Sequence, residues 1–266
     1  MTRERTDKNS AFTLTELLVV TAIVGILAAL VLPAISQSKK RAQQIQCVNN
    51  VRQLGLALRE FVTDKNAYPF FVNPHASHGN YPEYASYWVD ALQNQIDNKS
   101  HTNDDAFMSQ SIWQCPAAYK PSGWIPNGGD LIYDDYGYNA FGLSHMSDTN
   151  CLGLGGTYIS PVSPFPPVHE SQVVNPSEMI AIGDGFYGYS GEIRDGTWNL
   201  GRGYGPTKIL DRTQRAYTRH QGKANVVFCD GHVESPTLQF LFEDTSDAAL
   251  SRWNRDHQPH REKLSP

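Results

Sequence analysis

The stretch "FTLTELLVVTAIVGILAALVLP", residues 12–33, decides how this 266-residue chain is organised, because it is apolar and carries one charge, Glu16. From Leu17 to Ile35 no residue is charged. As a helix this run spans about 28 Å, close to the thickness of the hydrocarbon core of a bilayer. A cleavable secretory signal has a shorter apolar region and then a small-residue cleavage site, whereas this run continues into "SQSKKRAQQ". The sequence therefore predicts a transmembrane helix over residues 14–35.

The carboxylate of Glu16 needs an explanation, because a charge inside a membrane helix is costly, although less so near an end. Two readings are open. Glu16 lies at the interface and reaches water, or it meets a cationic partner when the helix packs against others. In the same helix, Pro33 cannot donate a hydrogen bond to the carbonyl of Ala29. This predicts a bend or a local loss of helix.

The residues "AFTLTE", 11–16, followed by the apolar run, resemble the processing site of type IV prepilins and type II secretion pseudopilins. The resemblance implies that prepilin peptidase cuts between Ala11 and Phe12, removing the leader 1–11, and that the new amino group of Phe12 is methylated. It also implies that Glu16, the fifth mature residue, pairs with the Phe12 amine of a neighbouring subunit. The residue before the cut is usually Gly in this family, so Ala11 implies slower processing at worst.

Further expectations come from the same resemblance. Gly25 and Pro33 stand at the fourteenth and twenty-second mature positions, where many pilins have Gly and Pro, and they are candidate assembly residues. Lys and Arg flank both ends of the apolar run, so charge alone does not orient it. The resemblance implies a single pass through the inner membrane, with a cytoplasmic leader and a periplasmic body. An inner-membrane assembly platform and other pilin-like subunits are the implied partners, and a fibre is the implied final location.

Residues 36–64 predict an amphipathic continuation, so that one helix covers residues 12–65. The apolar positions recur at spacings of three or four, which places them on one face of a helix. Asn66 and the pair Tyr68-Pro69 predict its end. The predicted apolar face consists of Ala42, Ile45, Val48, Val51, Leu54, Leu58 and Phe61.

The remainder, residues 66–250, alternates short β-type runs with Gly, Pro, Asn and Asp clusters, which predicts an antiparallel sheet with long loops. A short helix is expected near residues 84–96, and the polar tail 251–266 is expected to be flexible. The predicted fold class is α+β and pilin-like. A long N-terminal helix, transmembrane and then amphipathic, packs on a β-rich extracytoplasmic body.

A hairpin is predicted near the end of the body, because Asp230-Gly231 lies between "NVVFC" and "HVES" and favours a two-residue type I′ turn. With His220 it resembles the H-X9-DG segment, residues 220–231, of a group of prepilin-like proteins. Either His220 packs beside the hairpin, or it gathers with Asp184, Asp230 and His232 around a metal. The resemblance to major pseudopilins, which hold Ca²⁺ in a C-terminal loop, implies that this metal would be Ca²⁺. However, Ca²⁺ prefers six to eight oxygen ligands, and a histidine ligand favours a transition metal instead.

Four cysteines are widely spread and lack any zinc-type spacing: Cys47, Cys115, Cys151 and Cys229. Their even number is compatible with two disulfides in any of three pairings, or with four reduced thiols. Cysteine usage alone does not fix the compartment.

Composition and motifs narrow the function. A formal net charge of −5 without a Lys/Arg stripe argues against a nucleic-acid partner. The sequence has no G-x-S-x-G, HExxH, P-loop or dinucleotide-binding fingerprint, so an enzyme and a resident cofactor are not expected. The leading hypothesis is a structural subunit of a type II secretion or type IV pilus-type fibre. The alternative is a membrane-anchored protein that does not polymerise and binds a ligand, for example a carbohydrate, on the aromatic clusters "YDDYGYN" and "GFYGYSGE".

Overall fold

A computed structural model describes residues 13–71, 87–97, 111–118, 135–144, 148, 151–156, 167–189, 192–195 and 219–264. The chain divides into two compact units, Met1–Ala42 and Gln43–Pro266. The expected leader 1–11 and the expected first mature residue, Phe12, lie outside the described residues.

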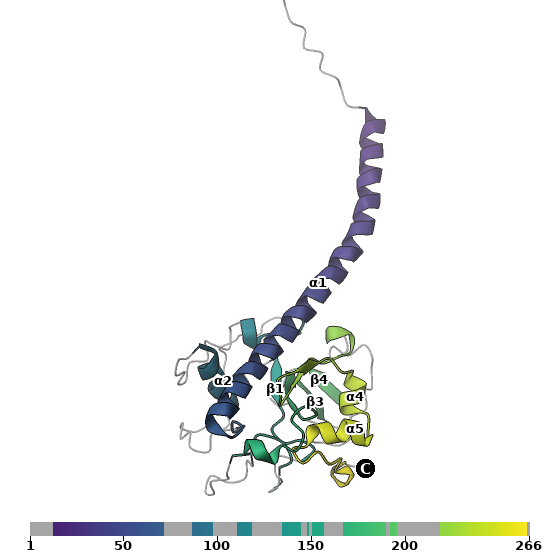
Figure 1. Ribbon diagram of the computed structural model, residues 1–266. Helices are drawn as coiled ribbons and strands as arrows, with labels where there is room; N and C mark the ends of the chain where they lie inside the picture. Colours follow the sequence, from purple (N-terminus) through teal and green to yellow (C-terminus); the bar gives the residue numbers. More distant parts are fainter. Residues whose placement is uncertain are drawn as a thin grey trace, which may run out of the picture. The chain divides into compact units, whose positions relative to one another are not determined.

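The secondary structure combines one very long helix with short helices and strands (Figure 1). The α-helices are α1 (Leu14–Lys65), α2 (Tyr87–Asp97), α4 (Leu238–Phe242) and α5 (Asp247–Leu250). The strands are β1 (Tyr136–Tyr138), β2 (Ile180–Asp184), β3 (Phe186–Tyr189), β4 (Glu192–Asp195), β5 (Val226–Phe228) and β6 (Val233–Glu234). The 3-10 turns are η3 (Ser111–Trp113), η4 (Glu170–Gln172), η5 (Arg219–Gln221), η6 (Ser251–Trp253) and η7 (Arg261–Lys263). The predicted α+β class, with a long N-terminal helix and an antiparallel sheet, is confirmed.

Helix α1 runs for 52 residues and continues through Pro33. Of the two outcomes expected at Pro33, a bend or a local loss of helix, the loss is therefore wrong. Proline removes one backbone hydrogen bond, and the strong helix formers Leu32 and Ala34 on either side favour continuation.

The main sheet has the strand order β1-β2-β5-β6, with each neighbouring pair antiparallel. Both of its faces are covered, because successive strand residues point to opposite sides. In β5, Val227 joins the hydrophobic cluster that contains α1, whereas Val226 and Phe228 join a second cluster with α4. In β2 there is a register shift between Ile180 and Ile182, and these two residues lie in different clusters: Ile180 in the second and Ile182 in the first.

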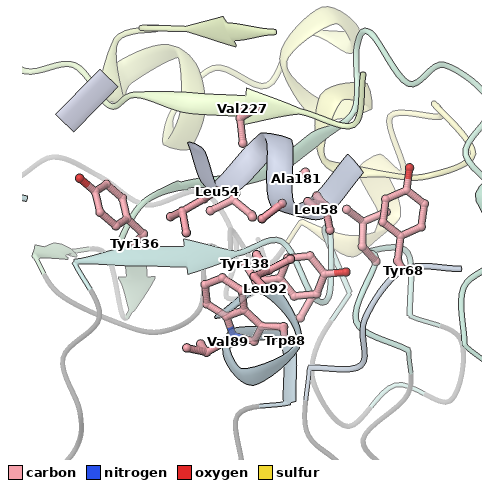
Figure 2. Packing of buried hydrophobic residues seen from close by; sticks show 14 of the residues in the cluster. Leu54, Leu58, Tyr68, Trp88, Val89, Leu92, Tyr136, Tyr138, Ala181 and Val227 are labelled. Carbon is pink, nitrogen blue, oxygen red and sulfur yellow. The ribbon is translucent and has the colours of Figure 1, made fainter. Parts of the chain in front are cut away.

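The first hydrophobic cluster lies where α1 meets the sheet and α2 (Figure 2). Leu54 and Leu58 of α1 and Val227 of β5 are fully or almost fully buried there. The ring of Trp88 in α2 stacks on Tyr138 of β1 with ring centroids 5.4 Å apart. The second half of α1 is thus an integral part of the core of the body.

The buried face of α1 differs from the predicted face at its start. Val51, Leu54, Leu58 and Phe61 are buried as expected, but Ala42 and Ile45 are exposed and Val48 is only partly buried. Cys47 and Asn50 face inward instead. The physical reason is the segment 111–118 beside the helix. The side-chain amides of Gln43 and Asn50 donate to the carbonyls of Pro116 and Gln114, both at 2.9 Å, and so fix which face turns inward.

The C-terminal segment is ordered and packed, so the expected flexible tail 251–266 is wrong for residues 251–264. Trp253 has no exposed surface, and it packs in the second cluster with Phe242. The side-chain amide of Asn139 donates to the Trp253 carbonyl at 3.0 Å. The prediction failed because it rested on the polar composition of the tail, whereas one large apolar side chain, Trp253, anchors it in the core.

A close approach between α1 and β5 yields a prediction for Gly55. A Cβ atom at this position would lie inside van der Waals contact with the side chain of Val227. Overpacking a filled core costs about 1–3 kcal/mol, which exceeds the helix-propensity gain of up to about 1 kcal/mol. We therefore expect Gly55→Ala to lower the free energy of unfolding by about 1 kcal/mol, measured by urea titration of the full-length protein in detergent. Gly25→Ala is the control, because no described atom lies within 4 Å of its added Cβ, and an equal loss in both variants would contradict the packing argument.

Candidate functional site

The first half of α1 presents apolar side chains on all sides. An eighteen-residue window of the helix reaches a mean hydropathy of 2.8, and none of that window is buried within the chain. Leu18 and Leu30, for example, are 62% and 69% exposed. By length and composition this helix can cross a membrane. A signal sequence near an N-terminus can have the same length and composition, so the side chains at the start of the helix bear on the assignment.

Glu16 closes the start of α1 by pairing with Thr13. The backbone N–H and the hydroxyl of Thr13 donate to Oε2 of Glu16 at 2.9 and 2.7 Å. In return the N–H of Glu16 donates to Oγ1 of Thr13 at 3.3 Å. This is a capping box, in which two residues three apart satisfy each other's backbone donors. Sequence reasoning missed Thr13, although the spacing T-x-x-E was visible.

The carboxylate of Glu16 is thus held at the exposed first turn of α1, where it can accept further donors. Gly25 and Pro33 lie farther along the same exposed half of the helix. The structure places these expected assembly residues on one surface-exposed element.

A disulfide fixes the second half of α1 to the body. It joins Cys47 of α1 to Cys115, which follows η3, with a Cα–Cα separation of 5.2 Å. The other two cysteines, Cys151 and Cys229, are buried free thiols. Burial raises the pKa of Cys151 to about 11 and that of Cys229 to about 12, so both stay protonated at neutral pH. Of the four cysteines, Cys47 and Cys115 therefore form one disulfide, whereas Cys151 and Cys229 do not form a second one.

Asp184, at the end of β2, is the centre of a buried polar cluster. Its Oδ1 accepts from Nη2 of Arg219 at 2.8 Å, and both side chains are at most 1% exposed. Its Oδ2 accepts from the backbone N–H and the side-chain amide of Asn225 at 2.6 and 3.1 Å. Burial alone would raise the pKa of Asp184, but the charge of Arg219 and the hydrogen bonds from His220 and Asn225 outweigh it and hold the pKa below its ordinary value.

His220 lies between this cluster and the disulfide. Its Nε2 is 3.4 Å from Oδ2 of Asp184 and 3.3 Å from Sγ of Cys115. Cys115 and Arg219 were not expected here. Arg219 directly precedes His220 in η5, whereas no spacing in the sequence relates Cys115 to His220. The two residues meet because Asp135, before β1, accepts from the Cys115 N–H at 2.7 Å and through its carbonyl from Arg219 at 2.7 Å.

Asp230 and His232 form a separate pair at the hairpin between β5 and β6. His232 Nδ1 is 2.6 Å from Oδ1 of Asp230, which also accepts the His232 backbone N–H at 3.1 Å. The predicted two-residue type I′ turn is wrong, because Gly231 has a φ of 93° while Asp230 is not among the described residues with positive φ. The N–H of Gly231 donates to the Phe228 carbonyl at 2.9 Å. The loop is one residue longer than predicted, with glycine alone in the left-handed position.

The four residues considered for a metal therefore fall into two pairs, His220 with Asp184 and Asp230 with His232. The Asp184 oxygens already accept three hydrogen bonds, from Arg219 and Asn225. Calcium would need six to eight oxygens, which this pairing does not gather. Within the described part of the chain, a different group has converging ligand atoms, namely Cys47, Cys115 and His220.

The aromatic platform considered for carbohydrate is not supported by its described members. Tyr136 and Tyr138 of "YDDYGYN" have no exposed surface and lie in the core, so they offer no face to a sugar. The side chains of "GFYGYSGE" beyond Gly185 lie outside the described residues.

Comparison with known proteins identifies the N-terminal region. Residues 6–32 match the family model "Prokaryotic N-terminal methylation motif". This region contains the expected cleavage position and the start of α1 with Glu16. The predicted resemblance to prepilins is therefore confirmed for this part of the chain, whereas no comparison shows the H-X9-DG segment.

Two kinds of relative share about a quarter of the chain. The type IV major pilin protein PilA of Myxococcus xanthus is 38% identical over 66 residues, which cover 25% of this chain and 30% of that protein. The type II secretion system core protein G of Escherichia coli is 39% identical over 64 residues (24% and 44%), and that of Aeromonas hydrophila is 42% identical over 62 residues (23% and 43%). The matches thus span less than half the length of these relatives. All three are named as pilin or secretion-system proteins, and none by an enzymatic activity. No solved structure matches the chain significantly.

Proposed function

We propose that this chain is a pilin-like structural subunit that assembles into a type II secretion or type IV pilus-type fibre. The observation that carries the proposal is the methylation motif at residues 6–32, which includes most of the exposed apolar half of α1. Prepilin peptidase removes residues 1–11, and Phe12 is then N-methylated. The mature chain then begins four residues before Glu16.

The location follows from the same chemistry. Before assembly, the apolar half of α1 spans the inner membrane once, and residues after it form a periplasmic body. An inner-membrane platform then transfers the helix into a fibre of pilin-like subunits. The Cys47–Cys115 disulfide supports an oxidising compartment for the body.

The proposal predicts the mass of the N-terminal peptide of protein isolated from its native membranes. We expect mass spectrometry to find a chain that begins at Phe12 and carries one methyl group. The matched variant is Ala11→Gly, which restores the residue usual before the cut and is expected to speed processing. An intact leader in the natural chain would overturn the subunit proposal, and the membrane-anchored binding protein would replace it.

A further inference from the structure

Three possible metal-ligand atoms lie close together beside the second half of α1. The proposed function assigns no role to them. They belong to Cys47, Cys115 and His220, which are all buried, and they lie within 4.8 Å of one another. The three residues come from three separate elements: α1, the segment after η3, and η5. Folding of the body, rather than local sequence, brings them together.

His220 is held toward the sulfur atoms at a conformational cost. Its φ of 50° and ψ of 27° lie in the left-handed region, which is unfavourable for a residue with a side chain. Such a conformation persists only where the surroundings fix it, and it is frequent at functional sites. Here it places Nε2 at 3.3 Å from Sγ of Cys115. The same Nε2 lies 3.4 Å from Oδ2 of Asp184, so zinc would take the place of that contact.

We propose that reduction of the Cys47–Cys115 disulfide converts this cluster into a binding site for one zinc ion. A dithiol or phosphine reductant supplies two electrons, two protons complete the two thiols, and the reductant is oxidised in turn. Zinc then displaces the two thiol protons and is ligated by both thiolates and by Nε2 of His220. Two sulfurs and one imidazole nitrogen are a donor set typical of zinc, and the fourth tetrahedral position accepts a water or a carboxylate oxygen.

The cluster then has two mutually exclusive states, and both connect α1 to the body. The disulfide links α1 to the body covalently, and zinc links the same two sulfurs through coordinate bonds. Zinc bound to the thiolates blocks their oxidation, because the thiolate is the form that attacks a disulfide oxidant. The attachment of α1 to the body would then persist under reducing conditions.

The test uses the full-length protein in detergent with Cys151→Ala and Cys229→Ala, so that Cys47 and Cys115 are the only thiols. After reduction with a phosphine, we expect one equivalent of Co²⁺ to give thiolate-to-cobalt charge-transfer absorption, which zinc then removes. Zinc is also expected to slow reoxidation by oxidised glutathione by on the order of tenfold or more. X-ray absorption at the zinc edge should count two sulfur neighbours and one imidazole.

Two histidine variants make the test specific. His220→Asn keeps a residue that tolerates positive φ but lacks the imidazole, and we expect it to weaken cobalt binding by on the order of tenfold or more. His232→Asn removes a histidine that pairs with Asp230, and it should bind as the parent does. Absence of the cobalt band in the reduced parent would overturn the proposal. So would equal binding by His220→Asn, or an absorption spectrum without sulfur neighbours.

Discussion

Replacing Asp184 by alanine is expected to lower the free energy of unfolding of the body by about 3–5 kcal/mol, which is the cost of removing one partner of a buried ion pair. The variant would leave the guanidinium of Arg219, which is 1% exposed, without its carboxylate. It would also remove the acceptor of the Asn225 N–H. Urea titration of the full-length protein in detergent, followed by tryptophan fluorescence, measures the loss.

The same carboxylate predicts acid sensitivity. In the folded chain the pKa of Asp184 is held below its ordinary value of 3.8, because Arg219 and the hydrogen bonds outweigh the effect of burial. A carboxyl group with a lowered folded-state pKa stabilises the fold above its unfolded-state pKa, and this contribution is lost as the pH falls through the folded-state pKa. We therefore expect the stability of the natural chain to fall as the pH drops below about 4, and that of Asp184→Ala to change less over the same interval.

Asp230→Ala is the matched control for Asp184→Ala. Its pKa is also lowered, against the effect of burial, by hydrogen bonds from His232. However, its side chain is 37% exposed, so solvent screens the pair. Its loss should cost about 0–1 kcal/mol. Equal losses in the two variants would show that Asp184 is not the centre of a buried electrostatic cluster.

The sequence predicted the long-range architecture because periodicity reports which side of an element is apolar. The charge-free run and the stripe through Val51, Leu54 and Leu58 sufficed for α1. Which face of α1 is buried before Val51 was not predictable from periodicity. It depends on contacts with residues 111–118, which are distant in the sequence. Trp253 escaped prediction because a single buried side chain leaves no periodic signal.

The candidate sites divide in the same way. The motif at the start of α1 is local, so Glu16 and its surroundings were visible in the sequence. The proximity of His220 to Asp184 was among the possibilities considered, as part of a metal group with Asp230 and His232. Cys115 was not, because the folded chain brings it there, through the disulfide and the contact with Asp135, from a position that no spacing relates to His220. Arg219 directly precedes His220, but no pattern in the sequence indicated that it would pair with Asp184. Non-local chemistry of this kind requires the folded chain.

Glu16→Ala is expected to reduce the fibre fraction by on the order of a hundredfold while the protein still inserts into the membrane. In the proposed fibre, Glu16 neutralises the methylated amine of Phe12 in a neighbouring subunit, in an apolar core that excludes water. Removing the carboxylate leaves that amine without a partner, and an unpaired charge in such surroundings is strongly unfavourable. Glu60→Ala is the control, since Glu60 is an exposed carboxylate on the same helix. The measurement compares sheared fibres with membranes by immunoblot.

Two further variants separate pairing between subunits from capping within one chain. Thr13→Ala removes the hydrogen bonds to Oε2 of Glu16 but leaves its charge, so its fibres should form nearly as well as those of the natural chain. Glu16→Gln keeps an oxygen that can accept the Thr13 N–H but lacks the charge, and it should fail as Glu16→Ala does. If Glu16→Gln assembled normally and Thr13→Ala did not, the carboxylate would serve only to cap α1. Normal fibres from Glu16→Ala would contradict the pairing itself, because no other side chain between Phe12 and Ile35 carries a charge that could replace it.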